Sequence, residues 1–410
     1  DGQVLTSTGS GVGWEDAAGG VTFKAFGTSS IMVGDDATGT ISAANYNTGL
    51  GVDVFAALTS GDNNVAVGYN AGAGITTGTL NTFIGGLAGD ATTTASDNTG
   101  VGAASMGGNT TGTRNTALGS DSLKVSTEGN DNTAIGKGSL AANTTASNNT
   151  AVGKNSLTAN TTGAQNTAVG QGAGESNTTG VSLVALGRQA LEANTEGDFN
   201  TALGQRALFK NTTSDNNTAV GNQALGENTT GAGNTAVGAD ALDANTTANN
   251  NTAVGRSSLG ANTTGTFNTA SGRQALLSNT TGDNNVAVGG NALYQNTTAD
   301  DNTAVGAYSL DANTTGNSNV AVGTSSLSAN TVGDRSVAVG YNALLVQNPD
   351  SNVDMYNVAV GYAAGAAVTT GTNNTLIGGL AGDAITTGGQ NVAVGIYSLS
   401  ANTDGQYNTA

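Results

Sequence analysis

The residue types that most often carry catalysis or bind metals are largely missing from this sequence. Its 410 residues include no histidine and no cysteine, which excludes the commonest general base, the commonest metal ligand and all thiol chemistry. An acyl-transfer site would need a serine beside a lysine or paired carboxylates, but serines such as Ser156 and Ser258 recur because the sequence repeats. Glycan hydrolysis would need two carboxylates in one cleft, and the acidic residues are scattered over variable positions. We therefore predict no enzyme, no catalytic, cofactor-binding or metal-ligating residue, and no cofactor.

The basic residues are few, but their placement is regular. Six of the eleven occupy the two positions after a recurring glycine: Lys137, Lys154, Arg188, Arg206, Arg256 and Arg273. Neighbours in successive repeats would lie about 4.8 Å apart, close enough to hold an anion or an acidic glycan. A solvated outer face that tolerates any polar residue explains the same placement, and we favour that interpretation.

The overall charge and hydropathy limit the partners. A net charge of -18 disfavours nucleic acids and anionic membrane surfaces, which require clustered Lys and Arg. The sequence contains no apolar run of about eighteen residues that would span a bilayer. We therefore expect no nucleic-acid partner and no membrane insertion in this segment.

The tripeptide Asn-Thr-Thr occurs eleven times, at Asn109, Asn143, Asn160, Asn177, Asn211, Asn228, Asn245, Asn262, Asn279, Asn296 and Asn313. Each copy matches the N-glycosylation sequon. Asparagine also favours turns, because it tolerates left-handed backbone geometry and bonds its own backbone, and stacked asparagines can form a hydrogen-bonded ladder. We favour the turn interpretation. The Gly-Gly-x-Gly-x-Asp repeat that binds calcium is absent.

These residues sit in a repeat of seventeen residues. Glycines recur at that spacing from Gly34 to Gly340 and continue at Gly361, Gly378 and Gly395, giving 22 in all. A branched aliphatic residue precedes 21 of the 22, the exception being Ser271. Such regularity, with 37% hydrophobic residues at fixed places, argues against disorder and for a repeat architecture.

A typical unit runs from Asn234 to Asn250 and contains two short apolar patches separated by turn residues. Seventeen residues are too few for a helical hairpin, and the Gly, Asn and Thr content disfavours helix. We predict an all-β fold, a parallel β-solenoid or β-roll of 17-residue coils. One Val and one Leu per coil would contribute roughly 2 to 3 kcal/mol each against about 25 kcal/mol of ordering entropy, so we also expect lateral association into an oligomer.

The variation between repeats predicts which residues face inward. Where the leucine four residues after the glycine is replaced by Thr38, Gly72, Gly365 or Gly382, the usual asparagine three residues later becomes Ile41, Ile75, Val368 or Ile385. Such volume compensation indicates one shared core. By strand alternation we expect Thr235 and Val237 to face the core and Ala236 to leave room for a second chain. The expected core residues are Val237, Leu242, Val254, Leu259, Ile75 and Ile385.

Two irregular segments divide the array. We assign residues 1–29 as a cap or attachment segment in which Val4, Leu5 and Trp14 cover an open end, 30–340 as solenoid, 341–356 as a coil with a four-residue insertion, and 357–410 as solenoid continuing beyond the chain end. The insertion contains the only proline. It is either a looped-out turn or a recognition loop presenting Asn348, Pro349, Asp350, Asp354 and Tyr356.

Two resemblances add to this interpretation. The Asn-Thr-Ala-Val-Gly core followed by Ser/Ala-Leu, over residues 30–410, resembles the repeat of YadA-like heads of trimeric autotransporter adhesins, and similar arrays occur in phage tail-fibre proteins. The segment Gly2-Gln3-Val4-Leu5-Thr6-Ser7 also resembles short segments of virion proteins. The first resemblance implies a left-handed β-roll and a homotrimer.

Three functions follow as hypotheses. The first is the structural shaft of a phage tail fibre in the virion, which sets length and stiffness and presents host-recognition elements. Its partners would be further copies of itself, other virion or cell-surface fibre proteins, and a host surface glycan. The alternative is a bacterial surface adhesin or extracellular filament, and the third is an ice-binding solenoid with flat arrays of stacked threonines.

Overall fold

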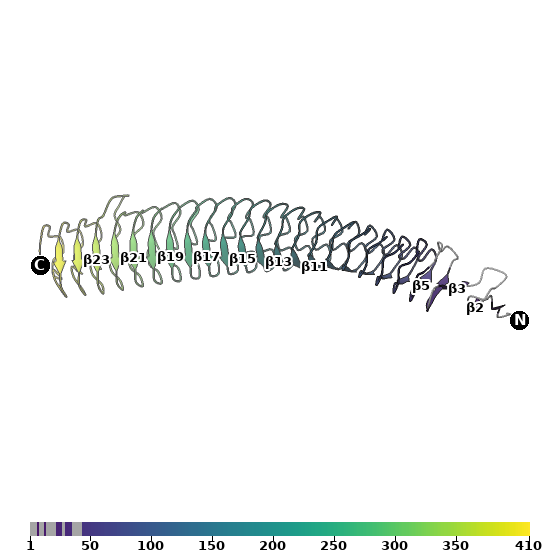
Figure 1. Ribbon diagram of the computed structural model, residues 1–410. Coiled ribbons are helices and arrows are strands. Elements are labelled where there is room, and N and C mark those ends of the chain that lie inside the picture. Colours follow the sequence, from purple (N-terminus) through teal and green to yellow (C-terminus); the bar gives the residue numbers. More distant parts are fainter. Residues whose placement is uncertain (1–5, 8–11, 14–21, 27–28, 35–42) are drawn as a thin grey trace. The chain divides into compact units, whose positions relative to one another are not determined.

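A computed structural model describes residues 6–7, 12–13, 22–26, 29–34 and 43–410 (Figure 1). Val4, Leu5 and Trp14 of the expected cap, together with Thr38 and Ile41, lie outside these residues. The chain divides into two compact units, Asp1–Asn200 and Thr201–Ala410. Every element in the described part of both units is a β-strand, so the predicted all-β class is confirmed.

The described residues of the first unit form thirteen strands: β1 (Thr6–Ser7), β2 (Val12–Gly13), β3 (Thr22–Phe26), β4 (Ser30–Gly34), β5 (Thr48–Gly51), β6 (Val65–Val67), β7 (Thr82–Ile84), β8 (Thr99–Val101), β9 (Thr116–Leu118), β10 (Thr133–Ile135), β11 (Thr150–Val152), β12 (Thr167–Val169) and β13 (Val184–Leu186). β1 pairs with β2, and β3 with β4, in antiparallel fashion. From β4 to β13 each strand pairs in parallel with the next along the chain.

The second unit contains twelve strands: β14 (Thr201–Leu203), β15 (Thr218–Val220), β16 (Thr235–Val237), β17 (Thr252–Val254), β18 (Thr269–Ser271), β19 (Val286–Val288), β20 (Thr303–Val305), β21 (Val320–Val322), β22 (Val337–Val339), β23 (Val358–Val360), β24 (Thr375–Ile377) and β25 (Val392–Val394). They also pair in parallel with their chain neighbours, and equivalent residues are partners, as Thr235 is with Thr252. Both units are thus parallel β-solenoids of coils of about seventeen residues, as the repeat predicts.

Glycine ends each strand for a geometric reason. Gly238 has φ of 138°, and a Cβ there would lie 2.6 Å from the carbonyl group of Gly255 in the next coil. Side-chain-bearing residues cannot tolerate either condition. The chain turns again with left-handed residues, including Asp240 at φ 57°, Leu242 at 50° and Asn250 at 59°.

The interior of a typical coil is narrow and holds one small strand residue, one leucine and two asparagines. In the coil of β16 these are Ala236, Leu242, Asn234 and Asn245, all fully buried. Leu259, Ile75 and Ile385 are also fully buried. The expectation that Val237 and Val254 belong to the core is wrong, because these side chains are 37% and 40% exposed on the outer face of the sheet.

The physical reason is the small volume available beside the leucine. Where the central strand residue is large, as at Phe83 and Leu376, the leucine of the same coil is replaced by Gly89 or Gly382. A Cβ at Gly89 would lie 2.5 Å from the Phe83 ring, and one at Gly382 would lie 2.7 Å from Leu376. The central strand residue and the residue four positions after the recurring glycine therefore share one volume. Where the latter is leucine, the strand centre must be alanine. Glycine also suits this position because the leucine it replaces is left-handed.

Two columns of buried asparagines connect successive coils. In the first column, Asn234 Oδ1 accepts a hydrogen bond from the backbone N–H of Asn251 (3.0 Å), and Asn234 Nδ2 donates to the carbonyl of Ala248 (2.8 Å). In the second, Asn245 Nδ2 donates to Asn228 Oδ1 (2.8 Å) and to the same Ala248 carbonyl (3.1 Å). Each amide thus satisfies backbone groups that would otherwise be buried without partners.

We predict that Asn245→Ala lowers the free energy of unfolding by about 3 kcal/mol, because it leaves Asn228 Oδ1 without this donor and opens a cavity. The exposed Thr247→Ala is the matched control and should change stability by less than about 0.5 kcal/mol. Urea unfolding followed by circular dichroism measures both. Equal losses for the two variants would mean that the asparagine column is not a stabilising element.

Candidate functional site

The outer face of the sheet in each unit carries a row of aliphatic side chains, interrupted at Ser271 in the second unit. We call this row the aliphatic stripe. Its members are the residues that precede the recurring glycine in strands β5 to β25. Its most exposed members range from 36% to 59% exposure: Leu50, Ile84, Leu118, Ile135, Val169 and Leu186 in the first unit, and Val237, Val254, Val288, Ile377 and Val394 in the second. The parallel register pairs Val237 with Val254, so neighbouring members lie side by side. Contiguous apolar surface of this kind is typical of interaction sites.

The insertion between β22 and β23 projects beyond the neighbouring turns (Figure 1). Its base is fixed. Asn348 Oδ1 accepts a hydrogen bond from Thr331 Oγ1 (2.6 Å), Pro349 is buried, and the Met355 side chain is fully buried near Gly333. A Cβ on Gly333 would lie 3.0 Å from Met355 Cγ and 3.1 Å from Pro349 Cδ. Met355 anchors the loop, a role that the sequence interpretation did not identify.

Two of the expected recognition residues are held by a neighbouring coil. Asp354 forms an ion pair with Arg335, and the Tyr356 hydroxyl donates to Asp354 Oδ2 (3.0 Å). The Arg335 guanidinium also lies 5.9 Å from the centre of the Tyr356 ring. Asp354, followed by Tyr356, raises the pKa of Arg335. Because Pro349 is buried and this cluster is internally paired, the exposed tip is the segment 350–353. Within it, Asn352 Nδ2 donates to the Thr315 carbonyl at 3.5 Å, and the Val353 carbonyl accepts from the Asp334 N–H at 3.0 Å.

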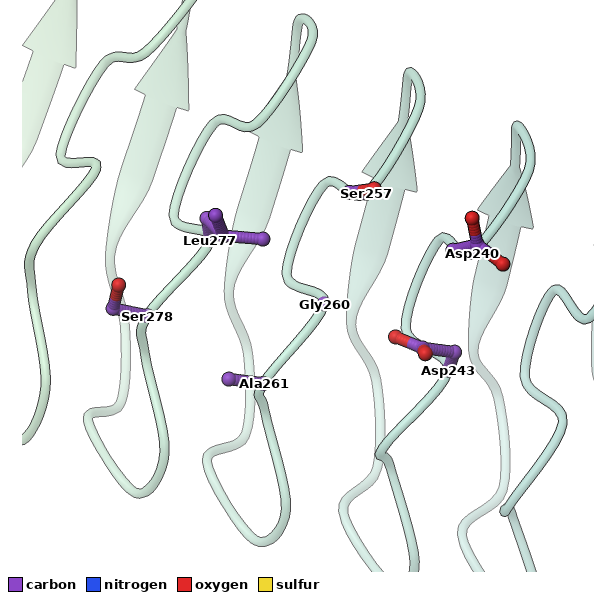
Figure 2. A pocket seen from close by; sticks show the side chains of 7 residues that line it. All are labelled: Asp240, Asp243, Ser257, Gly260, Ala261, Leu277 and Ser278. Atoms are coloured by element: carbon purple, nitrogen blue, oxygen red, sulfur yellow. The ribbon is translucent and has the colours of Figure 1, made fainter.

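The second unit also has a shallow depression of about 470 Å³ (Figure 2). It is lined by Asp240, Asp243, Ser257, Gly260, Ala261, Leu277 and Ser278. Gly260 occupies the position that Asp243 and Leu277 occupy in the adjacent coils, so the missing side chain creates the opening. Burial raises the pKa of the Asp243 carboxyl, and the charges of Asp240 and Glu227 raise it further.

This depression contains few ionisable groups. Its ionisable residues are two aspartates, without a lysine, arginine or tyrosine. Among the residues that the structure describes, no group of three or more His, Cys, Asp or Glu side chains is placed to hold a metal ion. The same residues include no helix long and apolar enough to cross a membrane. The missing side chain at Gly260 accounts for the depression.

The six regularly placed basic residues lie at the turn that follows each strand. Five of them have exposed side chains: Lys137, Lys154, Arg188, Arg256 and Arg273. Arg206 differs, because its guanidinium stacks on the Phe209 ring at 4.1 Å. Lys137 and Lys154 occupy equivalent positions of adjacent coils, as do Arg256 and Arg273.

The asparagines of the eleven sequons are not available for modification in the folded coils. Asn245 and its equivalents are fully buried, and the Asn245 amide nitrogen donates two hydrogen bonds within the column. These residues hold the coils together, in agreement with the ladder interpretation.

No protein-family model matches the chain, and no curated protein matches it. The fold and surfaces define it as an all-β solenoid repeat protein.

The electrostatic environment of Asp243 predicts a pH-dependent effect. The pKa of the Asp243 carboxyl is higher in the folded protein than in the unfolded chain, so the protonated carboxyl favours folding. This contribution to stability is fully present below the unfolded pKa of 3.8 and is lost as pH rises through the folded pKa. Asp243→Asn should therefore raise the melting temperature at pH 7, on the order of 1 °C, and the gain should shrink toward zero near about pH 3.

Asp131 supplies the control of opposite sign. The hydrogen bond from Arg114, at 2.7 Å between Nε and Oδ1, lowers the pKa of Asp131. Its contribution is present above the unfolded pKa and lost as pH falls through the folded pKa, so Asp131→Asn should slightly lower the melting temperature at pH 7. Scanning calorimetry at several pH values measures both variants. Shifts of the same sign would contradict this assignment.

Proposed function

We propose that the chain is the non-enzymatic structural shaft of a phage tail fibre, which sets the length and stiffness of the fibre in the virion. The observation that carries the proposal is the uniform in-register stacking of coils within each unit, with the asparagine columns joining them. In such a stack the number of coils sets length, and the hydrogen bonds between coils resist bending and extension. The resemblance to phage tail-fibre arrays supports the location.

The aliphatic stripe supports self-association. Most outward positions of the repeat vary freely: the position after the glycine is Lys137, Arg256, Tyr341 or Gly379 in different coils. The stripe position also points outward, yet 20 of its 21 residues in β5 to β25 are Val, Leu or Ile, the exception being Ser271. Strand propensity alone would also accept threonine, and it does not favour leucine over β-branched residues. An apolar partner explains this restriction, and a second copy of the chain presents a matching stripe.

The proposed assembly is a homotrimer of left-handed solenoids, as the resemblance to trimeric autotransporter heads implies. The three stripes would face one another around a common axis and leave the opposite faces in solvent. The tip at residues 350–353 would then be free to contact a host surface glycan or another fibre protein. Its anchoring by Met355 and by the Arg335–Asp354 pair gives such a contact a fixed position.

Self-association is tested by light scattering under native conditions. We expect a mass three times that of the 39.7 kDa chain. The variant Val237→Lys, Val254→Lys, Val288→Lys should dissociate it, raising the dissociation constant at least about tenfold, because each valine contributes roughly 1 kcal/mol when its exposed surface is buried.

The control places the same three charges on the opposite side of the same coils, as Ala244→Lys, Ala261→Lys, Gln295→Lys, and should keep the native mass. A monomeric native chain, or equal dissociation of the two variants, would contradict assembly through the stripe.

The location is tested separately by immunogold electron microscopy of a culture of the source organism. Antibodies against the chain should label fibres on phage particles. Label confined to bacterial surfaces or free filaments would refute the tail-fibre proposal in favour of an adhesin or extracellular filament.

A further inference from the structure

The two turns that flank the sheet face carry opposite charge. We call the two residues that follow the recurring glycine the exit edge. The entry edge is the turn that begins at the exposed threonine equivalent to Thr247 and ends just before the asparagine that precedes the next strand. In the coil of β16 these are 239–240 and 247–250. Asp240 and Ser257, on the exit edge, lie beside the arrowhead ends of their strands (Figure 2). The aliphatic stripe lies between the two edges.

The exit edge is predominantly basic. Between residues 43 and 410 it holds six bases and three acids, the bases being Lys137, Lys154, Arg188, Arg206, Arg256 and Arg273, and the acids Asp53, Asp121 and Asp240. Asp121 is engaged by Lys124 at 2.8 Å. Each unit contributes three of the six bases.

The entry edge is strongly acidic. Over the same residues, with 349–356 counted for the coil that carries the insertion, it holds fourteen acids and two bases. The acids are Asp62, Asp97, Glu128, Asp131, Glu196 and Asp198 in the first unit, and Asp215, Asp283, Asp300, Asp301, Asp334, Asp350, Asp354 and Asp404 in the second. Both bases are already neutralised, Arg114 by Asp131 and Arg335 by Asp354. Negative charge therefore dominates this edge in both units.

The opposite charges of the two edges distinguish two ways in which the aliphatic stripes of two copies can face each other. Rotation about an axis parallel to the coil stack keeps the copies parallel and places the exit edge of one opposite the entry edge of the next. Rotation about an axis parallel to the strands makes the copies antiparallel and places each edge opposite its own kind. Antiparallel copies would thus bring two acidic edges together, and like charges across an interface cost several kcal/mol.

We infer that the charged edges fix the orientation of self-association: the basic exit edge of one copy lies against the acidic entry edge of a second copy, so that the chains assemble in parallel. The inference rests on the proposed association through the stripe and adds its direction and its second contact surface. The contact is heterologous and closes into a ring around the common axis. Lys137 with Lys154, and Arg256 with Arg273, occupy equivalent positions of adjacent coils, so the members of each pair are about 4.8 Å apart, within the Debye length of about 10 Å at 0.1 M salt, and act together.

Energy transfer between labels at one end of the chain tests the orientation. The protein has no cysteine, so Ala401→Cys, on the side away from the stripe, introduces a single site for donor or acceptor dye. Donor- and acceptor-labelled chains are mixed and reassembled. Parallel copies bring the dyes together and should give efficient transfer. Antiparallel copies would separate the dyes by more than the stack of the second unit, roughly 50 Å for its twelve strands.

A charge variant tests the cause. The variant Lys137→Gln, Lys154→Gln, Arg256→Gln, Arg273→Gln removes four positive charges from the exit edge. In 20 mM salt its dissociation constant, measured by the same energy transfer, should be at least about tenfold higher than that of the native chain. In 0.5 M salt the two dissociation constants should lie closer together. The matched control, Ala142→Glu, Ala159→Glu, Ala244→Glu, Ala261→Glu, changes the net charge by the same amount on the opposite face and should associate like the native chain.

The outcomes separate the two proposals. An oligomer without energy transfer overturns the edge inference together with the three-fold arrangement, and leaves only association through the stripe standing. Equal weakening of the two charge variants overturns the edge inference alone. A monomeric native chain overturns both.

Discussion

The structure depends on hydrogen bonds that each coil makes to the next through buried asparagine amides. A coil of seventeen residues has almost no interior, so it cannot separate its backbone polar groups from an apolar core. Asn234 and Asn245 resolve this problem by entering the core and bonding both the backbone and the equivalent asparagine of a neighbouring coil. Because each amide is satisfied only by coils in register, the columns also enforce the period.

This constraint explains which changes the repeat tolerates. In several coils an inward position is altered together with a partner that restores volume or hydrogen bonding, whereas Gly174 replaces leucine while Ala168 and Asn177 keep the usual residues. Gly382 is accompanied by the larger Leu376, and Gly72 by Ile75, whose Cδ1 lies 3.0 Å from where a Cβ would be. Outward positions have no such requirement, so charge, aromatic residues and glycine vary there from coil to coil. Interaction surfaces therefore have to be built from outward residues.

The sequence was sufficient to predict the period, the parallel pairing and the inward leucine, since each follows from a pattern visible over many copies. It was insufficient to assign the strand faces. Alternation separates Ala236 from its neighbours but does not say which side is inside, and the rule that the larger residue is buried gave the wrong answer for Val237. The substitution of Phe83 for alanine beside Gly89 contained the missing signal, because a strand-centre residue that trades volume with the leucine position must share its core. The anchoring role of Met355 had no comparable signal, since the insertion occurs once.

The coil that carries the insertion shows how strictly the columns are maintained. Its first column has Ser336 in place of asparagine, too short to reproduce the amide bonds, and its second has Gln347, longer by one methylene. Gln347 Nε2 donates to Ser336 Oγ (2.9 Å), and Gln347 Oε1 accepts from Asn357 Nδ2 (2.9 Å), so one long amide joins both columns. All three side chains are fully buried. The hydrogen-bonded interior is thus preserved at the point where the outer chain departs from the period, which allows the loop to project without breaking the stack that positions it.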